Sequence, residues 1–217
     1  MQTVKFFKTK KEALSVVSSL SNTSKMPGLS WGISASLCKT GGKLAQVKGT
    51  VCSDCYAMKG SYTMYPAVAI AHGKRIDAYM ADRDAWIAAM IKLIDGQECF
   101  RWFDSGDLQS VDMLRDILAV CRATPSTKHW IATREVMFVK NADIPANVVI
   151  RISDVKPNAK LSTARVNVTG NISQVYLRNA QPQAGAHVCP APTQGGACGD
   201  CRACWSKSVT SVTYKIH

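Results

Sequence analysis

The sequence predicts an α/β fold, either a partial (β/α) barrel or an open, mostly parallel sheet, with cysteine-rich loops at the N-terminal side and in a C-terminal tail. Three observations predict it. Short apolar runs alternate with segments of helical periodicity, as in βα units. Polar and acidic residues follow the apolar runs, where parallel sheets place their working groups. Hydrophobic residues make up 47% of the 217 residues, which is enough for a packed core.

The first 60 residues predict little regular structure. A short helix is expected over residues 10–20, with Thr9 suited to cap its first turn. Residues 21–28 contain proline and glycine and are expected to form a loop. Residues 34–60 show little periodicity and carry three cysteines, so we expect a loop that bears ligands.

Helices and strands are expected to alternate in the middle of the chain. Residues 67–94 carry apolar side chains at helical spacing, which predicts a long helix with a break near Gly73 or Asp82. A second helix is expected at 110–121, capped by Ser110. Four strands are expected, at residues 99–103, 129–133, 147–152 and 174–177.

The predicted organisation is an α/β domain over residues 1–178 and a cysteine-rich extension over 179–217, packed on the same domain. The extension has a loop-like composition without a core pattern, so we expect a bound metal to order it. No apolar run approaches the roughly 18–20 residues of a membrane span. Lysines interrupt the first eight residues, which is unlike a signal peptide, so we expect a cytoplasmic protein without a membrane partner.

The charge balance leaves the class of partner open. A net charge of +12 is compatible with nucleic acid. However, the basic residues are spread along the chain without a dense block or a recognition motif, which favours a general basic surface.

Nine cysteines in a reducing compartment indicate metal or redox chemistry, because disulfides are rare there. In the tail, eight residues separate the first cysteine of a group of four from the second, and two residues separate each later pair. Four thiolates suit an iron–sulfur cluster or tetrahedral zinc, and successive two-residue spacings favour the cluster. The predicted ligands of this group are Cys189, Cys198, Cys201 and Cys204. His187 could substitute for one of them.

A second group is expected from Cys38, Cys52 and Cys55. Three thiolates on a four-iron cluster leave one iron open, much as an open zinc site does. The alternative here is structural zinc with a fourth ligand from elsewhere. Cys99 and Cys121 fit as ordinary core residues. The remaining seven cysteines divide into four and three, although one cluster shared between the groups is also compatible with the sequence.

Three motifs resemble a phage-encoded family catalogued as gene product 88. They are Cys52-Ser-Asp-Cys-Tyr-Ala, Arg101-Trp-Phe-Asp-Ser-Gly-Asp and Cys198-Gly-Asp-Cys-Arg-Ala-Cys-Trp. The resemblance extends over most of the chain and implies a phage protein in the host cytoplasm.

The layout also resembles, more distantly, the radical S-adenosylmethionine (SAM) enzymes. That resemblance implies a partial barrel, a three-cysteine cluster whose open iron binds SAM, and an auxiliary cluster near the carboxyl end. It implies that Ser105, Gly106 and Asp107 hold SAM, because a short motif after the second strand does so in those enzymes. The spacing of thirteen and then two residues between the first cysteines departs from the usual three and two.

These patterns predict an iron–sulfur protein with one open and one auxiliary 4Fe–4S cluster, radical SAM-like and reduced by a donor protein. Whether it is an enzyme stays open. One alternative is a non-catalytic electron carrier or redox sensor. A second is a structural-zinc protein that binds nucleic acid. Arg134 is a candidate for binding an anionic group, and a surface ion pair is its alternative. Asp104 and Asp107 could together position an amine or a metal, or cap the following helix.

Overall fold

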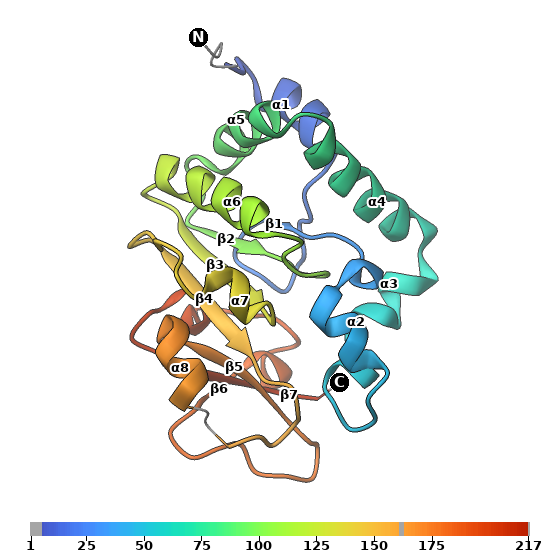
Figure 1. Ribbon diagram of the computed structural model, residues 1–217, viewed down its shortest axis with the longest axis vertical. Helices are drawn as coiled ribbons and strands as arrows, with labels where there is room; N and C mark the ends of the chain where they lie inside the picture. The colour runs from blue at the N-terminus through green and yellow to red at the C-terminus, as the bar shows by residue number, and fades with distance from the viewer. Residues whose placement is uncertain (1–5, 161–162, 217) are drawn as a thin grey trace.

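The computed structural model describes residues 6–160 and 163–216, and its centre is a sheet of seven parallel strands (Figure 1). The strands lie in the order β1-β2-β3-β4-β5-β7-β6. Their bounds are Ser30–Trp31, Cys99–Trp102, Lys128–Thr133, Val148–Ser153, Ile172–Tyr176, His187–Val188 and Ser211–Lys215 for β1 to β7. All six strand pairings are parallel, so the prediction of an open parallel α/β sheet is confirmed.

Eight α-helices and five short 3-10 helices accompany these strands in the described part of the chain. The α-helices α1 to α8 span Lys10–Val17, Lys39–Ala45, Ser61–Met64, Pro66–Ala81, Arg83–Ile94, Val111–Ala123, Val136–Val139 and Thr163–Thr169. The 3-10 helices η1 to η5 span Ala35–Leu37, Cys52–Asp54, Tyr56–Met58, Ala191–Thr193 and Ala203–Trp205. Within the residues described, no helix has the length and apolar character needed to cross a membrane.

Alternate residues of each strand face a core built with the helices. On this face Phe100 and Trp102 of β2 and Ile131 of β3 lie in one buried cluster with Trp86 of α5 and Leu114 of α6. Figure 1 shows α5, α6, α7 and α8 following one another along the sheet. The strand alternation therefore directs one set of side chains to the helices and leaves the other set facing the opposite way.

The cysteine-rich tail covers the opposite face. Cys99 and Trp130 form a second buried cluster there with Cys204, Trp205 and Val212. The rings of Trp130 and Trp205 meet edge to face at 5.3 Å, and the indole nitrogen of Trp205 donates to the carbonyl of Phe100 at 2.9 Å. The tail therefore packs as a second layer on the sheet.

Arg151 on β4 anchors this layer. Its side chain is fully buried, and its guanidinium donates to five backbone carbonyls at 2.8–3.4 Å. These carbonyls belong to Ile172, Ala203, Cys204, Ser206 and Thr210. The positive charge thus lies among buried carbonyl oxygens, of which those of Ala203, Ser206 and Thr210 also accept a backbone N–H.

Several predicted elements are confirmed. Thr9 caps α1 in a capping box with Glu12, and Ser110 caps α6. The long helix breaks at Asp82, which ends α4 and caps α5, and it continues through Gly73. All four predicted strands are present.

Two predictions for the loops were wrong. Residues 34–60 contain the helix α2 in addition to loop, and the tail contributes β6 and β7. β7 lies between β5 and β6 and pairs with both, so packing and backbone hydrogen bonds order much of the tail. The strand β1 was also missed, since two residues are too few for a period-two pattern. The division at 178/179 stays a prediction, although the two segments share this sheet.

Replacing Arg151 by methionine is expected to lower the free energy of unfolding by about 3 kcal/mol or more, because five carbonyls lose their buried donor. Urea denaturation would measure the change. As a matched control, Arg115→Met removes an exposed arginine of α6 and should change stability by no more than about 0.5 kcal/mol. Equal effects of the two substitutions would contradict this role for Arg151.

His129 gives the core a pH dependence. It is fully buried, accepts from the indole of Trp102 at 3.3 Å and lies 2.9 Å from the hydroxyl of Thr124. Burial lowers its pKa from 6.5 to about 4, and the Thr124 contact opposes this only partly. The unfolded chain therefore binds more protons between these values, so stability should fall as the pH falls from 6.5 to 4.

The expected loss from this residue is at most about 3 kcal/mol. Urea denaturation at several pH values should show a flatter dependence for His129→Gln, whose amide can also accept from Trp102 and donate to Thr124. His72 also has a pKa lowered by burial and remains in both proteins. If the free energy of unfolding depends on pH equally in both proteins, His129 does not titrate in this way.

Candidate metal centres

The first cysteine group lies beyond the carboxyl ends of the strands, on α2 and η2. Cys38 precedes α2 and Cys52 opens η2. Gly41 lies between them: a Cβ atom at this position would be 3.6 Å from the sulfurs of both Cys38 and Cys52. The backbone of α2 thus approaches the two thiols closely, and the glycine leaves the space beside them open. Figure 1 shows α2 beyond the arrowhead of β4.

Cys55 belongs to the same group, because its charge acts on the pKa values of Cys38 and Cys52. Burial raises the pKa of Cys38 to about 12, and the negative charges of Asp107, Cys55 and Cys52 add to the effect. The pKa of Cys52 is also raised, mainly by burial, while the guanidinium of Arg134 opposes the rise. Without a cation the two thiols are therefore protonated at neutral pH, and a bound metal would favour their thiolates.

Asp107 joins two loops at the same edge of the sheet. Its carboxylate accepts from the hydroxyl of Thr133, from the backbone N–H of Arg134 at 2.8 Å and from that of Leu108 at 2.8 Å. Burial raises its pKa to about 6, although these hydrogen bonds favour the charged form. Arg134, the sequence candidate for anion binding, donates to the carbonyl of Asp154. Asp107 therefore positions the loop after β3 beside the first cysteine group.

Ser105 and Gly106 lie in the same loop after β2. Gly106 has φ +77°, and a Cβ there would lie 2.5 Å from the side chain of Ile33 and 2.8 Å from its carbonyl oxygen. Only glycine combines this backbone conformation with so close an approach. The hydroxyl of Ser105 is buried, and no hydrogen-bond partner for it is found among the described residues.

Arg101 lies between the two cysteine groups. It donates to the hydroxyl of Tyr56, next to Cys55, at 3.2 Å. Its guanidinium also stacks on Trp130 at 4.5 Å from the ring centre. From there its charge opposes the rise in the pKa of Cys198 and Cys204 in the tail. No sequence pattern indicates this role, because the contacts join segments far apart in the chain.

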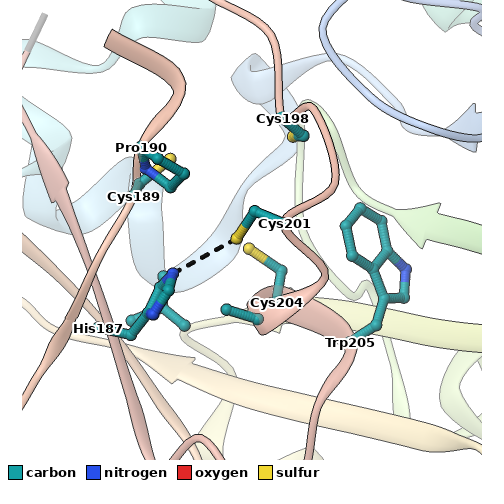
Figure 2. Close-up of a pocket in the computed structure, with 9 residues that line it drawn as sticks. His187, Cys189, Pro190, Cys198, Cys201, Cys204 and Trp205 are labelled. Carbon is teal, nitrogen blue, oxygen red and sulfur yellow. Dashed lines mark hydrogen bonds between the residues drawn. The ribbon is translucent and has the colours of Figure 1, made fainter. Parts of the chain in front are cut away.

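The second cysteine group surrounds a hollow on the tail side of the sheet (Figure 2). Its lining includes all four tail cysteines predicted as ligands, together with His187. The sulfur of Cys201 lies 3.4 Å from Nε2 of His187, and that of Cys204 lies 3.2 Å from the hydroxyl of Tyr214. β6 thus supplies an imidazole to the group, and β7 supplies a phenol.

Burial controls the charge of this group too. It raises the pKa of Cys204 to about 11, against the hydrogen bond from Tyr214 and the charges of Arg151 and Arg101. The pKa of Cys198 is raised as well, mainly by burial. Two guanidinium groups therefore lie close enough to favour thiolates here, as Arg134 does at the first group.

The donor types fit a metal, but the sulfurs do not yet converge on one point. In the described ranges, no three His, Cys, Asp or Glu side chains stand in ligating positions. The seven predicted ligands are nevertheless gathered in two places, and none of them forms a disulfide. Cys99 and Cys121 are fully buried in the core, as predicted.

The comparisons with known proteins give the family. The family model of gene product 88 matches residues 4–207, which is most of the chain. The chain belongs to the gene product 88 family. No curated protein and no solved structure matches it. The phage-family resemblance is thus confirmed, while the likeness to radical SAM enzymes stays a prediction.

Substitutions of two neighbouring glycines of α2 test how closely the backbone of this helix approaches the thiols. Gly42→Ala places its Cβ in open space and should stabilise the helix by about 1 kcal/mol. Gly41→Ala would place its Cβ 3.0 Å from that of Cys38, so strain should cancel most of that gain. Urea denaturation of both variants would measure the difference. An equal gain in the free energy of unfolding for both variants would show that α2 does not approach Cys38 closely enough to cause strain.

Proposed function

We propose that the chain is an iron–sulfur protein with two clusters, in a layout like that of the radical SAM enzymes. Cys38, Cys52 and Cys55 would hold an open four-iron cluster. The four tail cysteines would hold the auxiliary cluster. The observation that carries the proposal is the gathering of seven unbridged cysteines into two groups on opposite sides of Arg101.

The order of elements supports the radical SAM-like part. The first cysteine group follows β1, and Ser105, Gly106 and Asp107 follow β2, which is adjacent to β1 in the parallel sheet. Both lie beyond the carboxyl ends of the strands, where parallel sheets bind ligands. When bound, SAM would supply a carbon radical after reduction of the cluster, with the electron coming from a donor protein.

The residues after β2 would then divide their roles. Asp107 already accepts from three protein donors, so in this proposal it positions Thr133 and Arg134. The buried Ser105 hydroxyl has hydrogen-bonding capacity to spare for SAM. Gly106 allows the loop to approach Ile33.

A second candidate concerns the tail site, which zinc could occupy instead of a cluster. The proximity of His187 to Cys201 favours it, because imidazole with thiolates is a common zinc set. Zinc in the tail would keep this segment in a structural role. The positive charge of the surface would then make nucleic acid the partner to test.

Metal analysis of protein purified without oxygen tests the proposal. We expect about eight irons and eight acid-labile sulfides per chain, and a brown chromophore. Cys55→Ala and Cys204→Ala should each remove about four irons. The matched control Cys121→Ala removes a buried thiol from the core on the helix side of the sheet, outside both groups, and should leave the iron content unchanged.

Other results would change the assignment. A content of about four irons in the unsubstituted protein, with all of this iron lost in both Cys55→Ala and Cys204→Ala, would indicate one cluster shared by the two groups. Zinc without sulfide would overturn the iron–sulfur proposal and support the second candidate. Eight irons without cleavage of SAM under reducing conditions would leave an electron carrier or redox sensor, and would overturn the radical SAM-like part alone.

A further inference from the structure

We propose that a pocket beside the carboxyl-terminal half of β5 and the middle of β7 binds an anionic oxygen-rich group, a carboxylate or a phosphate. The pocket has a volume of about 150 Å³ and is lined by both strands and by the loops that follow β4 and β5. Its polar lining includes Asn158, Lys160, Gln174 and Gln183. The proposal goes beyond the metal centres and does not rest on them.

The side-chain amide of Gln174, which lines the pocket, is held in one orientation by its hydrogen bonds. Gln174 is buried, and its amide oxygen accepts from the hydroxyl of Ser211 at 2.6 Å. Its amide nitrogen donates to the carboxylate of Asp154 at 3.1 Å and to the carbonyl of Ala159 at 3.0 Å. A carbonyl, like an ionised carboxylate, can only accept, so the amide of Gln174 has a single orientation.

The orientation of the Gln174 amide determines which atom of the Gln183 amide faces it. Oε1 of Gln183 also accepts from the nitrogen of Gln174, at 2.9 Å, so the two N–H groups of Gln174 are shared among three acceptors. The NH₂ group of Gln183 is thereby left as a donor. Asn158 is fixed in the same sense, because its Oδ1 accepts from the backbone N–H of Leu177 at 3.0 Å. Both residues line the pocket with their oxygen engaged by the protein.

The charges agree with these donors. Lys160 belongs to the lining, whereas Asp154, which accepts from the amide of Gln174, forms an ion pair with Arg165 at 2.8 Å. The lining therefore includes one lysine and two amides whose oxygens are engaged by the protein, those of Asn158 and Gln183. Hydrogen bonds from such groups are strongest to charged acceptors, so the lining selects an anion over a neutral molecule.

The position is also that of a ligand site. Open parallel sheets bind ligands outside the carboxyl ends of their strands. The loop that forms one wall is held to the first cysteine loop, because the N–H of Val51 donates to the carbonyl of Val155 at 2.8 Å. The bound anion would therefore lie on the same edge of the sheet as the first cysteine loop, which follows α2 (Figure 1).

Calorimetric titration of the full chain tests the proposal, with inorganic phosphate and malonate as anionic probes and glycerol as a neutral probe. We expect binding of at least one anion and none of glycerol. Asn158→Asp and Gln183→Glu keep the accepting oxygen and replace the NH₂ donor by a charged oxygen. Each should weaken anion binding by about tenfold or more, because a charge-assisted hydrogen bond is lost and repulsion is added.

The matched control is Asn141→Asp, which makes the same charge change at an exposed residue outside the pocket lining. It should leave the affinity unchanged. Absence of binding for both anions, binding of glycerol as tight as theirs, or an equal effect of the control would each overturn the proposal. If one pocket variant fails to fold by circular dichroism, the other decides. The tighter of the two anions identifies the ligand as a phosphate or a carboxylate.

Discussion

The cysteine-rich tail depends on one buried cation. Arg151 extends from the central strand β4 and donates to two carbonyls within η5 and to the carbonyl of Ser206 directly after it, and η5 by itself is only one short turn. Carbonyl groups in such a turn have few partners of their own, so their burial is unfavourable unless a donor reaches them. The guanidinium provides five donors in one plane, and in doing so it fixes Cys204 and Trp205 against the sheet.

The same arrangement relates the two cysteine groups to each other. Tyr56 follows Cys55 directly and contacts Arg101, which stacks on Trp130, and Trp130 packs against Trp205 beside Cys204. The path from one group to the other thus consists of side chains in contact. The charge of Arg101 lowers the pKa of Cys198 and Cys204 against the effect of burial, so loss of this charge would raise both pKa values further.

Local patterns predicted the parallel sheet, the helix caps at Thr9 and Ser110 and the break at Asp82, since each depends on a few neighbouring residues. Cysteine spacing grouped the four tail thiols that line one hollow, while their role as ligands and the first group stay predictions. The strand β7 was not predicted, although Val212 and Tyr214 alternate with polar residues, because the composition before it is that of a loop. The contacts of Asp107, Arg101 and Arg151 join segments far apart in the sequence, and local patterns carry no information about them.

The position of β7 also sets an order of assembly. β6 pairs with β7 and, in the described part of the chain, with no other strand, yet β7 is the later of the two in the sequence. As the chain leaves the ribosome, His187 and the tail cysteines emerge before the strand that holds them against the sheet. The tail site therefore closes only after residues 211–215 are inserted beside β5. Until then its thiols remain exposed to oxidants and, in the proposed metal centre, to whichever metal the cell supplies first.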